Sequence, residues 1–377
     1  MSTFQTSVVI RRVRALLYRA KVDRPVVTSF GSLSERPALF VEVEDADGVC
    51  GWGEVWCNFP MFAAEERARF LQRVIAPMFE STEVAEPAEA RAQIDRVLGI
   101  QAIQAGEEGL VLSLAAGLDQ ALWDLVARRA GQPLWRLLGG TNTVSVCASS
   151  IDPHQALEMI ERERANGHRA FKLKVGFSDR IDLDTVAAVR EAFGESVVLM
   201  VDANQAWGLR RAIEVAERLA PHNPIWLEEP IRADEPLRVW QELSNRCPIP
   251  IAAGENIRSE HGFARLIDGG LVRHVQPDPG KWGGVSGSLT VGRRAVAARI
   301  GYSPHWLGGG VGLAVSLNLL GAVGGVGFAE IDVNPNPLRE AFPLPPVREG
   351  IVQLSEEPGF GFEPQFTALE GYRRQVG

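Results

Sequence analysis

The chain has 377 residues, 46% of them hydrophobic, and its 47 acidic against 39 basic residues give a formal net charge of −8. This length exceeds that of one compact core, so we expect one large domain and one smaller domain. The acidic balance argues against nucleic-acid and anionic-membrane partners, which call for basic patches.

Cysteine usage and the first residues bear on the compartment. The four cysteines show no metal-type spacing and are typical of reduced thiols: Cys50, Cys57, Cys147 and Cys247. The beginning, MSTFQTSVVIRRVRALLYRA, lacks the apolar segment of a signal peptide, and no run of eighteen apolar residues occurs. We therefore expect a soluble, cytoplasmic protein with no membrane partner.

Residues 1–130 have the pattern of an α+β module. Three stretches are typical of strands joined by turns: SVVIRRVRALLY, PALFVEVED and VCGWGEVW. Two further stretches are typical of helices: AAEERARFLQRVIAPMF and SLAAGLDQALWDLVARRAG. The segment GQPLWRLLGG follows, and its proline and paired glycines indicate a domain junction.

From residue 141 to about residue 350, short apolar strands alternate with amphipathic helices, which predicts a parallel α/β sheet, open or closed. We expect eight strands: VSVCAS, AFKLKV, VVLMVDAN, IWLEEP, PIAAGEN, RHVQPD, IGYSPH and GFAEID. Each has a polar or ionisable residue at its C-terminal end, and eight such strands make a barrel. Seven of these residues lie 23 to 30 positions apart, about one βα unit: Lys172, Asp202, Glu228, Glu255, Asp278, His305 and Glu330. In a barrel these ends converge on the C-terminal face, where active sites lie.

Two glycine-rich stretches, GKWGG and GGGVG, follow the sixth and seventh expected strands. Neither has the full spacing of a dinucleotide-binding or Walker phosphate loop. We interpret both as tight turns around a crowded site.

Three carboxylates end consecutive strands, namely Asp202, Glu228 and Glu255. Each one alone is more often a salt-bridge partner or a helix cap. Together they offer three hard oxygen ligands without a competing Cys or His, which favours Mg²⁺. Asn204 lies two residues beyond Asp202 on the same face, and it either binds a metal-bound substrate carboxylate or caps a loop.

The stretch FKLKVGF places Lys172 and Lys174 on one face of a strand, because residues i and i+2 share a face. Unpaired buried charge is costly, so the two lysines should point into a hydrated, anionic or catalytic site. The alternative is an edge strand whose lysines are exposed to solvent. Beside a divalent cation and a second ammonium group, Lys174 is expected to have a lowered pKa and to act as a general base.

Acid and base groups also end the last three strands. Asp278, bonded to one imidazole nitrogen of His305, would orient the ring and make a second acid/base group opposite the lysines. Glu330, if protonated, would donate a hydrogen bond to a substrate carboxylate; the alternative is a simple partner for Lys or Arg.

These motifs resemble those of the enolase superfamily, within it the mandelate racemase subgroup. KLK resembles its K-x-K motif, DAN its D-x-N motif, EEP and GEN its second and third ligand motifs, and PDPGKWGG with SPH its Asp/His pair. ALWDLVARRAGQPLWRLLGG is similar to the helix and linker that lead into the family's barrel. Enolase-superfamily sites are known to combine a Lys or His base with Mg²⁺.

The resemblance implies a modified (β/α)7β barrel with an N-terminal α+β capping domain. The cap would take residues 1–130 and the barrel residues 141–350, and residues 351–377 would return to the cap. By resemblance Glu228, and not Glu229, is the metal ligand. The shared reaction step is removal of the α-proton of a Mg²⁺-bound carboxylate, giving an ene-diolate.

The overall reaction and the substrate depend on further residues. With Lys174 and His305 both present, we expect dehydration of an acid sugar; the alternatives are a sugar-acid lactone cycloisomerase, suggested by GGGVG and DVNPNPLRE, and a racemase or epimerase of a 2-hydroxy acid. We assign four residues to binding this small carboxylate substrate: Asn204, Ser149, Lys281 and Trp306. The cap stretches VDRPVVTSFGSLS and VWCNFPMF would close over it, and we expect a homo-oligomer. A retaining glycosidase, which would need no lysine pair, and a catalytically silent barrel are the other classes considered.

Overall fold

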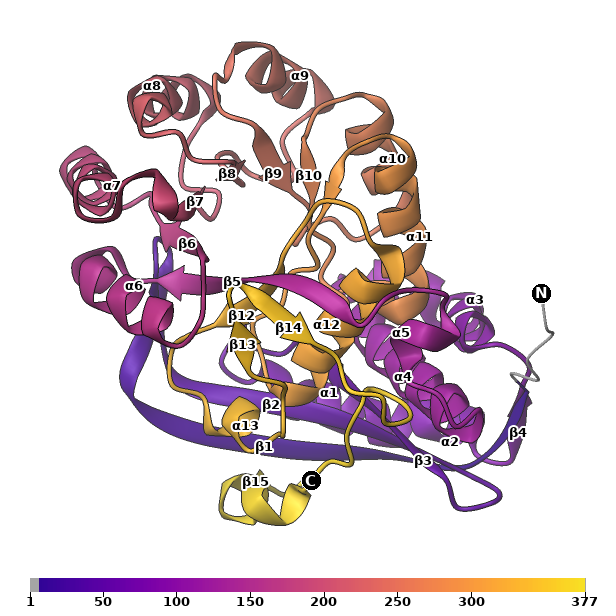
Figure 1. The fold of residues 1–377 in the computed structure, drawn as a ribbon. Helices are drawn as coiled ribbons and strands as arrows, with labels where there is room; N and C mark the ends of the chain where they lie inside the picture. The colour runs from indigo at the N-terminus through magenta and orange to yellow at the C-terminus, as the bar shows by residue number, and fades with distance from the viewer. Residues whose placement is uncertain (1–6, 377) are drawn as a thin grey trace.

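The computed structural model describes residues 7–376 and shows two sheets, each with its own helices (Figure 1). Residues 1–6 and residue 377 lie outside the described residues. The prediction that the chain does not begin with a signal peptide falls partly on residues 1–6. All four cysteines have free thiols.

The N-terminal part forms an antiparallel sheet in the order β15-β1-β2-β3, with β4 on β1. Its strands are β1 Val8–Thr28, β2 Gly31–Asp45, β3 Cys50–Val55, β4 Thr82–Val84 and β15 Arg373–Arg374. Its helices are α1 Ala63–Phe70, the π-helical η1 Leu71–Ile75, α2 Ala76–Phe79, α3 Pro87–Ala105 and α4 Glu108–Arg129. This is the predicted α+β cap.

Helix α4 lies directly on the cap sheet because β3 presents glycines to it. A Cβ on Gly51 or Gly53 would come within 2.2 or 2.0 Å of backbone oxygens of α4, so no larger residue fits there. Within residues 7–376, α4 is the helix whose length and composition would suffice to cross a membrane. Most of it is buried against β3, α3 and the barrel, so its apolar character serves the core.

The second sheet consists mainly of parallel strands in the order β12-β5-β6-β7-β8-β9-β10-β11. Its strands are β5 Thr143–Ile151, β6 Ala170–Lys174, β7 Val198–Asp202, β8 Leu227–Glu228, β9 Ile251–Ala253, β10 His274–Val275, β11 Gly301–Tyr302 and β12 Ala329–Asp332. The helices between them are α6 Ala156–Ala165, α7 Asp179–Phe193, α8 Leu209–Leu219, α9 Leu237–Arg246, α10 Glu260–Asp268, α11 Gly284–Ala297 and α12 Gly310–Val323. Figure 1 shows these helices on the outside of the strands. The arrangement confirms the predicted (β/α)7β barrel with its cap.

Shorter elements complete the chain. They are α5 Leu134–Leu137, α13 Pro337–Glu340, the 3-10 turns η2 Pro153–Gln155, η3 Gly194–Ser196, η4 Ala220–His222 and η5 Phe366–Tyr372, and the strands β13 Val347–Arg348 and β14 Ile351–Gln353. Strand β14 pairs with β5 of the barrel, whereas β15 pairs with β1 of the cap. A boundary at residue 350 would separate β14 from its barrel partner, so the division of the chain at 130, 141 and 350 remains a prediction.

The inward side chains of the barrel change character along each strand. An apolar layer at the N-terminal ends includes Met200 and Trp226. Two residues further along the same strands, on the same face, stand the buried carboxylates Asp202 and Glu228. Strand alternation therefore puts an apolar floor beneath a charged upper layer.

Two cap loops reach this upper layer. The β1–β2 hairpin tip contacts the end of β7, where Ser29 Oγ donates to Ala203 O at 3.3 Å. The segment after β3 contacts the loop after β10, where Trp56 N donates to Gly280 O at 3.2 Å. The cap thus covers the C-terminal ends of the barrel strands, as the sequence predicted for its two loops.

Candidate active site

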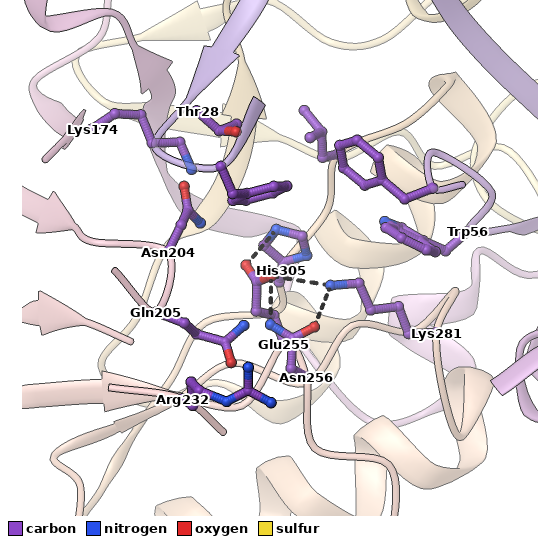
Figure 2. A pocket seen from close by; sticks show the side chains of 13 residues that line it. Thr28, Trp56, Lys174, Asn204, Gln205, Arg232, Glu255, Asn256, Lys281 and His305 are labelled. Carbon is purple, nitrogen blue, oxygen red and sulfur yellow. Dashed lines mark hydrogen bonds and ion pairs between the residues drawn. The ribbon is translucent and has the colours of Figure 1, made fainter. Parts of the chain in front are cut away.

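A cavity of about 560 Å³ lies where the barrel strand ends meet the cap loops. The barrel contributes Lys174, Asn204, Gln205, Arg232, Glu255, Asn256, Lys281, His305 and Leu307, and the cap contributes Thr28, Phe30, Trp56 and Phe59. Figure 2 shows Lys174 at one side of this cavity and Lys281 with Trp56 at the other, with His305 and Glu255 between them.

Both lysines of β6 point into the barrel and form ion pairs. Lys172 Nζ lies 2.6 Å from Glu228 Oε1 and 2.7 Å from Glu330 Oε2. Lys174 Nζ lies 2.6 Å from Asp202 Oδ2. Because both side chains are buried, the alternative of a solvated edge strand is excluded.

The lowered pKa of Lys174 was expected beside a divalent cation, and for that state it stays a prediction. Burial lowers the pKa of Lys174, but the charge and hydrogen bond of Asp202 together with the charge of Glu255 outweigh burial, and the net direction is upward. The expectation placed a metal charge on Asp202, whereas here that carboxylate is free to hold the lysine proton.

The three predicted metal ligands lie side by side. Asp202 stands opposite Glu228 in the β7–β8 ladder, and Glu228 stands opposite Ala252, three residues before Glu255. Each carboxylate is paired with a cation: Glu255 Oε1 lies 3.1 Å from Lys281 Nζ. Among residues 7–376, no three Asp, Glu, His or Cys side chains are gathered in a geometry that holds a metal ion. Their role as ligands therefore remains a prediction.

The charge of the surrounding side chains fits a divalent cation. We define the strand-end cluster as ten buried side chains, six carboxylates and four bases: Asp202, Glu228, Glu229, Glu255, Asp278, Glu330, Lys172, Lys174, Lys281 and His305. If all are ionised, the cluster has two negative charges in excess, a costly state in a buried site. Burial and the Asp202 charge raise the pKa of Glu228 to about 8, which reflects this excess. The carboxylate oxygens are donors that Mg²⁺ prefers, and the excess of carboxylates over bases suits a divalent cation.

Asp278 and His305 form the predicted pair. His305 Nδ1 lies 2.7 Å from Asp278 Oδ2, and His305 Nε2 lies 3.0 Å from Glu255 Oε2. Burial opposes the charged imidazole, but Glu255 and the hydrogen bond with Asp278 outweigh burial and raise the pKa of His305 to about 10. The other oxygen of Asp278 accepts from the backbone N–H groups of Gly280 and Lys281, which fixes the carboxylate.

Glu330 and Ser149 lie deeper than the cavity lining. Ser149 Oγ donates to Glu330 Oε2 at 3.0 Å, and the same oxygen is the one paired with Lys172. Glu330 is thus a lysine partner, the alternative that the sequence left open. Ser149 supports Glu330 in this structure.

The other three residues assigned to substrate binding are placed differently. Asn204 lines the cavity with φ at 45°, a left-handed conformation, and its N–H donates to Asp202 Oδ1 at 2.9 Å. Lys281 also lines the cavity, 4.8 Å from the centre of the Trp56 ring. Trp306 instead packs against Gly280, Gly308 and Gly312, and its indole N–H donates to Gly309 O.

Several site residues were not singled out from the sequence. Gln276 Nε2 donates to Glu228 Oε2 at 2.6 Å, and Trp226 Nε1 donates to the same oxygen at 3.2 Å. Each lies two residues before a predicted site residue, so strand alternation would have indicated it. Gln205, Arg232 and Asn256 follow the ends of β7, β8 and β9, where loop conformation decides which side chain reaches the cavity.

Comparison with known proteins identifies the family. Residues 155–368 match the family described as enolase C-terminal domain-like, and residues 11–139 match the mandelate racemase / muconate lactonizing enzyme N-terminal domain. The chain is 31% identical to D-galactarolactone cycloisomerase of Agrobacterium fabrum over 97% of this chain and 98% of the relative. It is 25% identical to arabinonate dehydratase of Saccharolobus solfataricus over 96% and 98% of the two chains.

Solved structures agree with this assignment. A mandelate racemase/muconate lactonizing enzyme from Bordetella bronchiseptica RB50 is 45% identical, covers 97% of this chain and 99% of its own, and has a TM-score of 0.91. A racemase from Streptomyces coelicolor A3(2) with bound magnesium is 27% identical, covers 97% and 100%, and has a TM-score of 0.87. The chain therefore belongs to the mandelate racemase / muconate lactonizing enzyme family of the enolase superfamily, and it is an enzyme of the lyase or isomerase type.

Proposed function

We propose that the protein removes the α-proton of a carboxylate substrate with the help of Mg²⁺ held by Asp202, Glu228 and Glu255. The observation that carries this proposal is the strand-end cluster, in which six carboxylates outnumber four bases and three of the carboxylates lie on adjacent strand ends beside Lys174. A magnesium-bound structure among the relatives supports it.

A bound Mg²⁺ would hold the substrate carboxylate and stabilise the negative charge that develops on it. Lys174 Nζ would exchange the α-proton on one face of the substrate, and His305 Nε2 would serve the other face. Lys172, fixed between Glu228 and Glu330, contributes a buried positive charge next to the developing ene-diolate. Asp278 holds the His305 ring so that Nε2 points to the site.

For the overall reaction we propose that loss of the α-proton is followed by breaking of the C–O bond at the β-carbon of an acid sugar or its lactone. The first candidate reaction is the opening of a lactone. It is supported by a relative that is 31% identical over 98% of its own length and is a D-galactarolactone cycloisomerase. Dehydration of an open-chain acid, which the sequence favoured, is the second candidate and is supported by the arabinonate dehydratase relative. Homo-oligomeric assembly and a cytoplasmic location are further parts of this proposal.

A substrate panel tests the overall reaction. We expect turnover within a set of mono- and diacid sugars and their lactones that includes galactarolactone and arabinonate. A cycloisomerase converts a lactone to a 2-keto acid of the same mass; a dehydratase converts an open-chain acid to a 2-keto acid lighter by one water. Mass spectrometry with a keto-acid assay distinguishes them. Deuterium incorporation at C2 without a keto product would instead identify a racemase, and absence of both products and exchange from the panel would contradict the proposal.

Metal dependence is tested by binding and by activity. We expect EDTA treatment to abolish turnover and Mg²⁺ to restore it. Mg²⁺ at about a hundred times its Kd stabilises a protein by about 2.7 kcal/mol, so it should raise the melting temperature of the wild type and leave that of Asp202→Asn unchanged.

The matched control for this test is Glu163→Gln. Glu163 is a buried carboxylate on α6 that pairs with Arg162 at 2.7 Å and accepts from Asn166, away from the strand-end cluster. This variant should keep both the Mg²⁺ response and the activity. Full activity after EDTA, or an undiminished Mg²⁺ response in Asp202→Asn, would contradict the metal site.

A further inference from the structure

Two buried carboxylates of the cap bind the N-termini of two successive barrel helices. Glu54 lies on β3 and contacts the start of α12; Asp119 lies on α4 and contacts the start of α11. The loop that precedes α12 carries His305, and the loop that precedes α11 carries Asp278. The two cap residues therefore contact the two loops that form the Asp278–His305 pair.

Glu54 is fully enclosed and is bound by backbone groups. Its Oε1 accepts from Gly309 N at 2.6 Å, and its Oε2 accepts from Gly312 N at 2.8 Å. Burial raises the pKa of Glu54 to about 8, while the N–H groups of Gly312 and Gly309 and the dipole of the helix favour its charged form. A Cβ on Gly309 would come within 2.7 Å of Glu54 Oε1, so the glycine permits this close approach.

Asp119 makes the equivalent contact one helix earlier. Its carboxylate accepts from Ser286 N at 2.9 Å and from Ser286 Oγ at 2.5 Å. Gly284 has φ at +57°, and a Cβ there would come within 2.4 Å of Asp119 Oδ2. Gly284 of GKWGG and Gly309 of GGGVG thus make room for cap carboxylates.

Gln120 links the backbone of Glu54 to the loop that carries Asp278. Its Oε1 accepts from Glu54 N at 2.9 Å, and its Nε2 donates to Pro279 O at 2.7 Å, in the loop of Asp278. A second cap side chain, Asn58, donates to Leu307 O at 2.6 Å, in the loop of His305. The cap therefore fastens both loops at several points close to the pair.

We propose that Glu54 and Asp119 are positioning residues that set the geometry of the Asp278–His305 pair from the cap. The proposal rests on the proposed function, in which His305 is an acid/base group. Catalytic groups lose effectiveness steeply when they are displaced, by about a hundredfold for a misplacement of 1 Å. A change at either carboxylate should therefore act on chemistry more than on substrate affinity.

The test compares Glu54→Gln and Asp119→Asn with Asp124→Asn. Asp124 is a matched control, because it is a buried cap carboxylate on α4 that accepts from two backbone N–H groups, those of Trp52 and Phe360, away from the His305 loop. In Glu54→Gln and Asp124→Asn the neutral amide brings an N–H₂ group toward a backbone donor and weakens the contact, and in Asp119→Asn it removes the charge to which Ser286 N–H and Oγ–H donate. All three variants should lose thermal stability.

Two readouts separate positioning from stability. The first is the downfield NMR signal of the His305 Nδ1 proton in the hydrogen bond with Asp278, assigned by its loss in His305→Asn. The second is kcat and KM with galactarolactone as the probe. We expect Glu54→Gln and Asp119→Asn to shift or broaden the His305 signal and to lower kcat about tenfold or more with a smaller change in KM. Asp124→Asn should change neither.

The outcomes are distinguishable. An unchanged His305 signal in both Glu54→Gln and Asp119→Asn would overturn the positioning role, whether or not the probe is turned over. Unchanged turnover in His305→Asn would instead overturn the proposed function and leave the NMR result to decide on positioning. If Glu54→Gln does not fold, Gln120→Met takes its place, because it removes the link between Glu54 and Pro279 at similar volume.

Discussion

Replacement of Lys174 by alanine is expected to lower turnover by about a hundredfold or more, the usual contribution of a positioned acid/base group. Lys174 Nζ lines the cavity and is held 2.6 Å from Asp202, so its removal takes away the proton carrier on that face of the substrate. Turnover of the substrate found in the panel and deuterium exchange at C2 in D₂O are the two measurements.

Two further variants are compared with Lys174→Ala, one as a control and one as a second test of the lysine pair. Lys21→Ala removes an exposed lysine of β1 and should behave as the wild type. Lys172→Ala should also lose activity, because it leaves Glu228 and Glu330 without their buried cation. If Lys172→Ala and Lys174→Ala both kept turnover and exchange at wild-type rates, the lysine pair would only fill the barrel.

The barrel was predictable because its strands carry two independent signals. One is the alternation of apolar strands with amphipathic helices. The other is the regular spacing of polar strand ends, which run from Lys172 to Glu330. The place of β14 was not predictable, because Ile351–Gln353 is a three-residue strand whose pairing with β5 depends on contacts far along the chain.

Within the site, the sequence indicates which residues meet but not how they are paired. Strand alternation brings Lys172 and Lys174 to the same face, yet only the structure shows that one contacts Glu228 and the other Asp202. The direction of the Lys174 pKa depends on that pairing and on whether a cation is bound, so the sequence could not fix it.

The cap contribution was the least predictable part. The stretch VCGWGEVW is typical of a strand, and strand propensity contains no information that Glu54 crosses to a barrel helix. Trp306 follows His305 and was expected at the substrate, but three glycines around its ring give it a packing site beside the cap. Contacts between domains arise from surfaces that no local pattern describes.

Replacement of His305 by asparagine should also lower turnover by about a hundredfold or more, but with a different exchange pattern. His305 and Lys174 line the same cavity on different elements, and each would serve one face of the α-carbon. The substrate should still incorporate deuterium at C2 with the variant that keeps the proton-abstracting base. With the variant that lacks this base it should not. Asp278→Asn should resemble His305→Asn, because it removes the carboxylate 2.7 Å from His305 Nδ1 that holds the ring.

His261→Asn is the control for this experiment, since His261 is an exposed histidine of α10 and should be replaceable without effect. ¹H NMR of the substrate in D₂O follows exchange at C2, and the keto-acid assay follows turnover in the same samples. One of the two variants, Lys174→Ala or His305→Asn, should exchange without turnover. If His305→Asn turns over at the wild-type rate, the mechanism uses a single base. If both variants lose exchange, neither group abstracts the proton without the other, and the assignment of one base to each face is wrong.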